Sequence, residues 1–311
     1  MSDGIDANDR EDSNDGRDPN AADRVDAGGS DDSGGAGDDG PGDAEGSDDA
    51  YDLDAGSDPA AYAAATPEVG VPDASGTVGD APAVRAVGVG PGDPEFLVPR
   101  AERAVREADV VVGFETVVDL VRDRTDADLL ACGYRDEAGT LTAFADRVAG
   151  GDRGVAVLRG DPNHSGYQFL GKVERAVEEA TDGGVGVRVV PGVSSLQVAA
   201  SRCRTPMEDA TFVTLHKRGD LSADLDRLRR DVGDRHLLVL PRPFDWMSGD
   251  VAADLLEHGG RADATALVCE RLTRDDEAIT RTTLEDLAEH AGGDGRDDSP
   301  FSDLSVLVVR R

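Results

Sequence analysis

The stretch AVRAVGVGPGDPEFLVPRAERAVREADVVV, residues 83–112, contains the first strand–turn–helix–strand unit of the predicted fold. The apolar run Val84–Val89 predicts a strand that ends in a turn rich in glycine and proline, and apolar residues then recur at helical spacing from Leu97 to Ala108. A second apolar run follows at Asp109–Val112. Because alternating strands and helices are typical of parallel pairing, this unit predicts an α/β protein with a largely parallel sheet that helices cover on both faces.

The same alternation continues to the end of the chain. Apolar runs predict further strands at residues 129–132, 155–158, 185–190, 211–215, 236–240, 264–269 and 304–309. Helical spacing predicts helices near 117–121, 140–148, 167–180, 196–202, 221–230, 251–257 and 284–290, with Thr140 as an N-cap. Two runs of about five strands, divided near 206–209, predict two lobes over residues 81–208 and 209–311.

The first 80 residues have a different composition from the rest. They hold 23 acidic residues and 3 arginines, a net charge of −20 out of −33 for the whole chain, and they contain no Phe or Trp. Such a segment cannot bury enough apolar surface to offset its ordering entropy, so residues 1–80 are predicted to form a disordered acidic tail. The tail is interpreted as solubilising; the alternative is an acidic arm that docks a basic partner.

The composition argues against several classes of function. The 65 acidic residues outnumber the 32 basic ones and repel phosphate groups, which disfavours nucleic-acid and membrane-surface binding. The sequence offers neither a membrane span nor a signal peptide, so a soluble cytoplasmic protein is expected. Three cysteines without a CxxC pair and five histidines without ligand spacing predict no disulfide framework and no metal site. Lys172 and Lys217 are the only lysines, and this arginine-for-lysine usage suggests a halophilic protein.

The turn after the first predicted strand is the first candidate ligand loop, because ligands of α/β sheets bind beyond the carboxyl ends of strands. It reads Gly88-Val-Gly-Pro-Gly-Asp93. A dinucleotide fingerprint would need glycine where Asp93 stands, and Pro91 lacks the N–H that could meet a phosphate. The loop is therefore expected to bring bare backbone close to a neutral or cationic ligand. A purely structural tight turn is the alternative.

Three further loops carry unusual residues after predicted strands. In Arg159-Gly160-Asp161-Pro162, followed by Asn163 and His164, helix capping and ligand binding by Asp161 are equally favoured. In Pro191–Ser195, two hydroxyls stand at a helix start, where capping by Ser194 is the simpler interpretation. His216-Lys217-Arg218 could bind carboxylates or form a charged surface turn.

The order of these loops resembles that of the tetrapyrrole methylases, the S-adenosylmethionine-dependent enzymes of sirohaem and cobalamin synthesis. The resemblance rests on VGVGPGD (87–93), RGDPNHSG (159–166) and VVPGVSSLQVAASR (189–202), and it covers residues 83–311. Within that family, PGVSSLQVAASRCRTPMEDATFVTLHKR (191–218) and VCERLTRDDEAITRTTLEDL (268–287) are most similar to the cobalt-precorrin-7 C5-methyltransferases of anaerobic cobalamin synthesis.

The resemblance implies a two-lobed α/β fold, usually a homodimer, with S-adenosyl-L-methionine bound in a cleft between the lobes. It implies cofactor contacts by Gly90, Pro91, Gly92, Gly160, Asp161, His164, Ser194, Ser195, Leu240 and Thr282. The sequence departs from the family pattern at Lys217, where His-Gly-Arg is usual, and at Thr282, where glycine is common. These two departures concern contacts in the second lobe.

The implied substrate is a cobalt-precorrin that carries acetate and propionate groups. Arg159, Lys217, Arg218 and Arg242 are its expected carboxylate clamps, and Asp93 and His216 are the candidate proton acceptors. Since the sequence ends at Arg311, directly after the last predicted strand, the C5 step alone is expected, with a C15-methyltransferase on a separate chain. The alternatives are a C17 or C11 cobalt-precorrin methyltransferase, a diphthine synthase, or a non-enzymatic binding module.

Overall fold

The computed structural model describes residues 83–311, with the exception of Tyr134, Ser165 and Arg218. The predicted tail, residues 1–80, and the predicted clamp Arg218 therefore lie outside the described residues. Within the described part of the chain, two five-stranded sheets are present. No helix of that part is long and apolar enough to cross a membrane.

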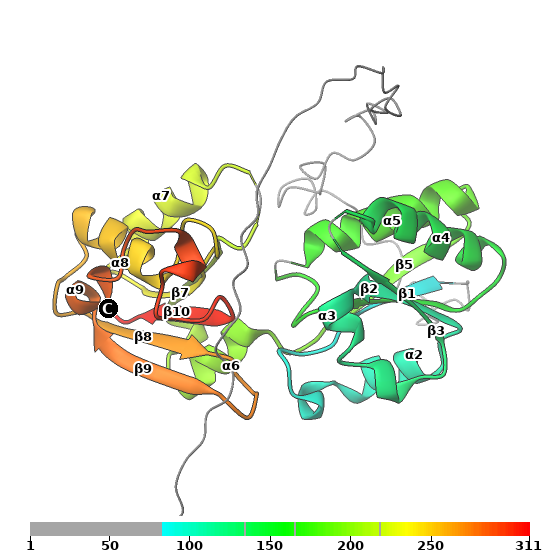
Figure 1. Cartoon of the computed structure of the whole chain (residues 1–311), viewed down its shortest axis with the longest axis horizontal. Helices are drawn as coiled ribbons and strands as arrows, with labels where there is room; N and C mark the ends of the chain where they lie inside the picture. Colours follow the sequence, from blue (N-terminus) through cyan, green and yellow to red (C-terminus); the bar gives the residue numbers. More distant parts are fainter. Residues whose placement is uncertain (1–82, 134, 165, 218) are drawn as a thin grey trace, which may run out of the picture. The chain divides into compact units, whose positions relative to one another are not determined.

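The first sheet is entirely parallel, with strand order β3-β2-β4-β1-β5 (Figure 1). Its strands are β1 (Ala83–Gly88), β2 (Val110–Phe114), β3 (Asp128–Cys132), β4 (Gly154–Leu158) and β5 (Gly186–Val190). Parallel strands require crossover connections, and the intervening sequence supplies them as helices. The parallel α/β arrangement predicted from the alternating pattern is confirmed for this sheet.

Helices cover both faces of the first sheet, because alternate residues of each strand point to opposite sides. On one face, Val84 and Ala86 of β1 pack with Phe144 of α4 (Glu137–Ala149) and Leu170 of α5 (Tyr167–Thr181). On the other face, Val87 packs against α2 (Pro99–Arg106) and α3 (Glu115–Val118). A strand buried on both faces reads as a continuous apolar run, which is the pattern of Val84–Val89.

The second sheet is mixed, with strand order β6-β7-β10-β8-β9. Its strands are β6 (Ala210–Thr214), β7 (His236–Leu240), β8 (Thr265–Glu270), β9 (Ala278–Thr283) and β10 (Ser305–Val309). Only β6 and β7 pair in parallel; β10 runs antiparallel to both β7 and β8, and β9 is antiparallel to β8. The prediction of largely parallel pairing was wrong here, because the final strand inserts between β7 and β8 in the reverse direction.

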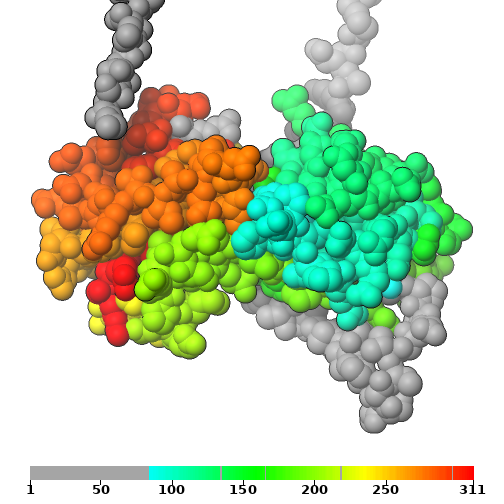
Figure 2. Space-filling view, turned by 90° about the horizontal axis from the view of Figure 1, so that it is seen from below, coloured from blue at the N-terminus to red at the C-terminus, as the bar shows by residue number. Residues whose placement is uncertain are grey.

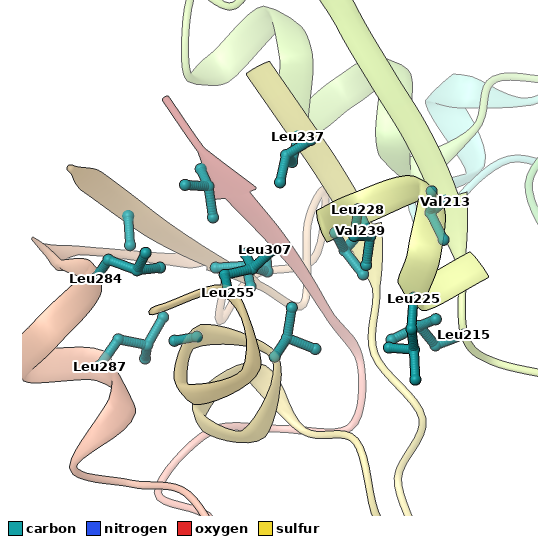
Figure 3. Packing of buried hydrophobic residues seen from close by; sticks show 14 of the residues in the cluster. Val213, Leu215, Leu225, Leu228, Leu237, Val239, Leu255, Leu284, Leu287 and Leu307 are labelled. Atoms are coloured by element: carbon teal, nitrogen blue, oxygen red, sulfur yellow. The ribbon is translucent and has the colours of Figure 1, made fainter. Parts of the chain in front are cut away.

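The core of the second region is built from leucines on three helices, shown in Figure 3. The helices α7 (Ser222–Asp231), α8 (Ser248–Glu257) and α9 (Leu284–Ala288) bring Leu228, Leu255 and Leu284 against Leu237 and Leu307 of the sheet. Each fully buried leucine contributes about 1.5–3 kcal/mol of transfer free energy. The opposite face is covered by α6 (Ser195–Arg202).

Candidate cofactor and substrate site

Three glycines lie in contact at the carboxyl ends of the adjacent strands β4, β1 and β5. A Cβ atom on Gly88 would lie 2.7 Å from the Gly192 nitrogen, and one on Gly192 would lie 2.8 Å from the Gly88 carbonyl carbon. Both would also press on the carbonyl oxygen of Gly160. No side chain fits at Gly88 or Gly192, so these loops meet through backbone alone.

The loop after β1 is pinned to the loop after β4 by a pair of backbone hydrogen bonds. Gly160 N donates to Gly90 O at 2.9 Å, and Gly90 N donates to Gly160 O at 3.4 Å. Both glycines have positive φ, +83° at Gly90 and +67° at Gly160, which a residue with a side chain adopts only at a cost. The buried Pro91 follows. The motif around Gly90 therefore builds a rigid turn and not a phosphate-binding loop.

Asp161 connects the loop after β4 to the loop after β5. Its Oδ2 accepts a hydrogen bond from Gly192 N at 3.0 Å, and its Oδ1 accepts one from Asn163 N at 2.8 Å. The carboxylate is only partly buried, so lone pairs remain for a ligand. Asp161 therefore orders its own loop and can bind a donor at the same time.

Ser194 begins α6 with a reciprocal capping box. Its Oγ accepts a hydrogen bond from Leu196 N at 3.0 Å, and Gln197 Oε1 accepts one from Ser194 N at 2.7 Å. The capping interpretation of Ser194 is confirmed. Its side chain is buried, so its contribution to a ligand site is to fix where α6 starts.

A cavity of about 230 Å³ lies beside these loops. Its lining combines one carboxylate, one imidazole, small polar groups and two larger apolar side chains: Asp161, His164, Ser194, Gln197, Met207 and Phe212. The His164 ring is tilted against the Phe212 ring, with centroids 6.0 Å apart. Burial lowers the pKa of His164, and the neighbouring Asp161 carboxylate partly opposes that shift. His164 is therefore a neutral ring at neutral pH.

The loop between β8 and β9 contacts the first loop directly. Asp93 N donates to Thr273 Oγ1 at 3.1 Å, and a Cβ on Gly92 would lie 3.1 Å from Arg274 Nε. Figure 2, a view from below, shows cyan residues from the start of the described chain in contact with orange residues of the β8–β9 part. The Asp93 carboxylate itself caps the short helix at Pro94–Phe96, accepting from Glu95 N at 2.7 Å.

The cations of the loop after β6 are held by internal partners. Lys217 Nζ lies 2.7 Å from Asp224 Oδ2, with both side chains about one-seventh exposed. Arg242 pairs with both oxygens of Asp245 and donates to Gly219 O at 3.2 Å. These two predicted clamps therefore stiffen the loop in the structure, and their charge is already compensated by carboxylates.

His216 differs from its neighbours on that loop. Desolvation lowers its pKa; the Asp303 carboxylate opposes this shift, and Arg159 adds to it. The residue is nevertheless exposed, so solvent reaches the ring and its ionisation contributes little to stability. A neutral, accessible imidazole is a suitable proton acceptor.

The structure brings some predicted residues together and leaves others apart. Asp161, His164 and Ser194 line one cavity, next to the turn made by Gly90 and Gly160. Ser195 is the first residue of α6 and does not line that cavity. Two further predicted cofactor contacts lie on strands instead: Leu240 at the end of β7, where its carbonyl accepts from Leu215 N at 2.8 Å, and Thr282 on β9 opposite Ala266.

Sequence reasoning missed several residues of this neighbourhood. Gln197 and Phe212 line the cavity, and Thr273 and Arg274 contact the turn after β1. Gln197 stands three residues after Ser194, which is the spacing of a capping box and could have been noticed. Thr273 and Arg274 carry no such local signal, because their position depends on how β8 and β9 pair.

The sequence profile of the tetrapyrrole (corrin/porphyrin) methylases matches residues 83–288. The chain is 30% identical to a probable cobalt-precorrin-7 C(5)-methyltransferase of Methanocaldococcus jannaschii, over 71% of this chain and 95% of that protein. It is 26% identical to the cobalt-precorrin-4 C(11)-methyltransferase of the same organism, over 67% of this chain and 82% of that protein. The crystal structure of the methyltransferase CobJ has the same fold, with a TM-score of 0.60 at 22% identity over 74% of this chain and 94% of the other.

The chain therefore belongs to the tetrapyrrole methylases, a family of methyltransferases. The methyl donor of this family is S-adenosylmethionine, and it is the cofactor of this chain. The predicted family and cofactor are thus confirmed.

Proposed function

We propose that this protein methylates C5 of a cobalt-precorrin in anaerobic cobalamin synthesis, with S-adenosylmethionine as the methyl donor. The observation that carries the proposal is the cavity in which Asp161, His164 and Ser194 meet. These three residues come from two of the loops, 159–166 and 189–202, on which the resemblance to the tetrapyrrole methylases rests. The choice of C5 is supported by the higher identity and longer coverage of the C(5)-methyltransferase from Methanocaldococcus jannaschii, compared with its C(11) counterpart.

The side chains around this cavity fit a nucleoside that carries amino and hydroxyl groups, because they offer hydrogen-bond acceptors and flat rings. The Asp161 carboxylate has acceptor capacity beyond its bonds to Gly192 and Asn163. The His164 and Phe212 rings offer flat surfaces against which an aromatic base can pack. When bound, the cofactor supplies a methyl group on a positively charged sulfur. Asp161 and His164 would hold and orient it.

The residues of the chain contribute to the rate mainly through orientation. The methyl group of a sulfonium is already electrophilic, so positioning the substrate carbon in line with it can supply up to roughly 7–11 kcal/mol. The glycine contacts between Gly88, Gly160 and Gly192 make the surrounding loops rigid enough for such positioning. Exclusion of water by these packed loops protects the geometry.

A proton must leave the macrocycle when a ring carbon is methylated. We propose His216 as its acceptor in preference to Asp93. Asp93 uses its carboxylate to cap the helix at Pro94–Phe96, whereas the His216 ring is exposed and its lowered pKa keeps it neutral. Arg159 is the predicted clamp that we retain for a substrate carboxylate, because Lys217 and Arg242 already pair with Asp224 and Asp245.

Two measurements test the proposed function. Calorimetric titration of S-adenosyl homocysteine in molar potassium chloride should show binding, and Asp161→Asn should weaken it by about tenfold or more. The matched control is Asp263→Asn, a change at an exposed carboxylate, which should leave the affinity unchanged. Incubation with individual cobalt-precorrins should then give a product with one added methyl at C5. A wild-type chain that does not bind S-adenosyl homocysteine, or that adds no methyl group at C5 of any cobalt-precorrin, contradicts the proposal.

A C11- or C17-methylating enzyme of the same family is the second candidate, favoured by the similarity to the C(11)-methyltransferase. The same incubations separate these possibilities, because the methyl position in the product differs. We also propose that the chain works as a homodimer, as the family resemblance implies. Light scattering in high salt would give the mass of the assembly, and a monomer at working concentration would contradict that part.

A further inference from the structure

Arg159 and Arg274 are partly buried guanidinium groups that lack an acidic partner among the described residues. Several other partly buried arginines pair with a carboxylate, as Arg124 does with Glu102 at 3.0 Å and Arg229 with Asp254 at 2.6 Å, whereas Arg235 donates to the carbonyl oxygens of Glu208 and Ala210. Arg159 donates only to the carbonyl of Thr116, at 3.1 Å. In a chain with 65 acidic and 32 basic residues, a guanidinium group that pairs with no carboxylate keeps N–H donors for an anionic ligand.

The two arginines flank the same turn. Arg274 packs on Gly92, where a Cβ would lie 3.2 Å from Arg274 Cγ. Arg159 directly precedes Gly160, which pairs with Gly90 on the same turn. Burial lowers the pKa of Arg159, and the positive charge of Arg274 lowers it further. Two like charges beside the same turn repel each other, and an anion bound between them would remove that repulsion.

The hairpin loop that presents Arg274 has a strained backbone. Thr273 has φ +71° and Arg271 has φ +47°, and a β-branched residue such as threonine rarely adopts positive φ. The strain is maintained by specific contacts: Glu277 accepts from Thr273 N at 2.7 Å and pairs with Arg202 at 2.8 Å. Backbone held in this way indicates that the position of the next residue matters.

We propose that Arg159 and Arg274 together form a receptor for one carboxylate of the bound tetrapyrrole. The inference rests on the proposed function, because it takes the macrocycle as the ligand. Guanidinium groups bind carboxylates through paired N–H donors, and two of them can hold one carboxylate from two sides. The anion removes the repulsion between the arginines. Methionine-derived cofactors also carry a carboxylate, so the experiment separates the two sources.

The experiment compares two ligands on four variants in one buffer of fixed potassium chloride concentration. The variants are Arg159→Gln, Arg274→Gln, the double variant, and Arg281→Gln as a matched control on the exposed part of β9. The ligands are uroporphyrin III, a porphyrin with eight carboxylates, and S-adenosyl homocysteine. Each single receptor variant should weaken uroporphyrin binding by about tenfold and change S-adenosyl homocysteine binding by less than about twofold. The control should change neither.

The double variant tests whether the guanidinium groups of Arg159 and Arg274 bind the same carboxylate. Its loss of uroporphyrin affinity should be smaller than the product of the two single losses, because either change already breaks the shared site. The melting temperature without ligand should stay the same or rise for Arg274→Gln, since repulsion from Arg159 is removed. A fall in melting temperature together with an unchanged uroporphyrin affinity would mean that Arg274 is structural, and would overturn the proposal.

Two other results would overturn it in different ways. If Arg274→Gln weakens S-adenosyl homocysteine and not uroporphyrin, the arginines bind the carboxylate of the cofactor. If wild-type protein binds S-adenosyl homocysteine but not uroporphyrin, the receptor assignment fails while the methyl-donor site stands. Failure of wild-type protein to bind S-adenosyl homocysteine instead contradicts the proposed function, and the response of uroporphyrin to Arg274→Gln still reports on the receptor.

Discussion

The two five-stranded sheets position their loops by different means. The loops of the first sheet meet backbone against backbone at Gly88, Gly160 and Gly192. A loop of the second sheet is held by charged side chains, with Lys217 on Asp224 and Arg242 on Asp245. Backbone contacts give rigidity that neither salt nor pH alters, whereas ion pairs can be changed by both. The first region should therefore be sensitive to added side-chain atoms at its glycines, and the second to the loss of a charge.

The largest expected effect is that of a methyl group at the glycine contact. Gly88→Ala should destabilise the protein by several kcal/mol and abolish S-adenosyl homocysteine binding, because the new Cβ would lie within 3.0 Å of Gly192 backbone atoms. Gly139→Ala is the control: no atom within 4 Å would meet its Cβ, and alanine favours the α4 helix, so it should stabilise by up to about 1 kcal/mol. Urea denaturation measures both. Equal effects would contradict the backbone contact.

An intermediate effect is expected at the ion pair of the second region. Lys217→Met leaves the partly buried Asp224 carboxylate without its partner, which should cost about 3 kcal/mol in the free energy of unfolding. The exposed pair of Arg261 and Asp263 offers the comparison, and Arg261→Gln should change stability by less than about 1 kcal/mol. If Lys217→Met matched Arg261→Gln in urea denaturation, the loop would not depend on its charges.

The sequence predicts the first region better than the second for a physical reason. Strands buried on both faces, such as β1 and β4, are continuous apolar runs and were found within one or two residues. The edge strand β9 was missed because Ala278–Thr283 is mostly polar and half of its residues are exposed. Its pairing with β8 is a tertiary interaction that no local pattern records.

Local hydrogen bonds explain the other differences. Thr140 was predicted as an N-cap, and that prediction was wrong: α4 begins at Glu137, and Thr140 Oγ1 donates to Asp136 O inside the first turn. The candidate site was predictable where a residue acts through its own loop, as Asp161 and Ser194 do. It was not predictable at Thr273 and Arg274, which reach the turn after β1 from about 180 residues further along the chain.

A smaller effect is expected from the capping box of α6, the helix that follows β5 of the first sheet and covers one face of the second sheet. Ser194→Ala removes the acceptor for Leu196 N and should cost about 1 kcal/mol of stability. Ser195→Ala removes a neighbouring hydroxyl that makes no cap, so its stability should match that of wild type. S-adenosyl homocysteine titration of Ser195→Ala then tests the predicted cofactor contact: weakened binding at unchanged stability supports it, and unchanged binding contradicts it.

The smallest expected effect is a change in pH dependence at His164. Because burial lowers its folded pKa below the ordinary value of 6.5, the unfolded chain takes up a proton first as the pH falls. Its contribution to stability is complete above pH 6.5 and is lost as the pH falls from 6.5 through the lower folded pKa. His164→Gln should remove this part of the slope, as measured by urea denaturation at a series of pH values in constant salt.

The matched control for this prediction is His236, whose pKa is also lowered by burial but which begins β7 and does not line the cavity. His236→Gln should change the pH dependence of stability and leave that of S-adenosyl homocysteine binding as in wild type. A cofactor that packs on His164 desolvates it further, so wild-type affinity should fall as the pH drops, and His164→Gln should lose that fall. If both variants keep the wild-type pH dependence of binding, the cofactor does not bury His164, and the cavity beside the glycine contacts is not where the cofactor packs.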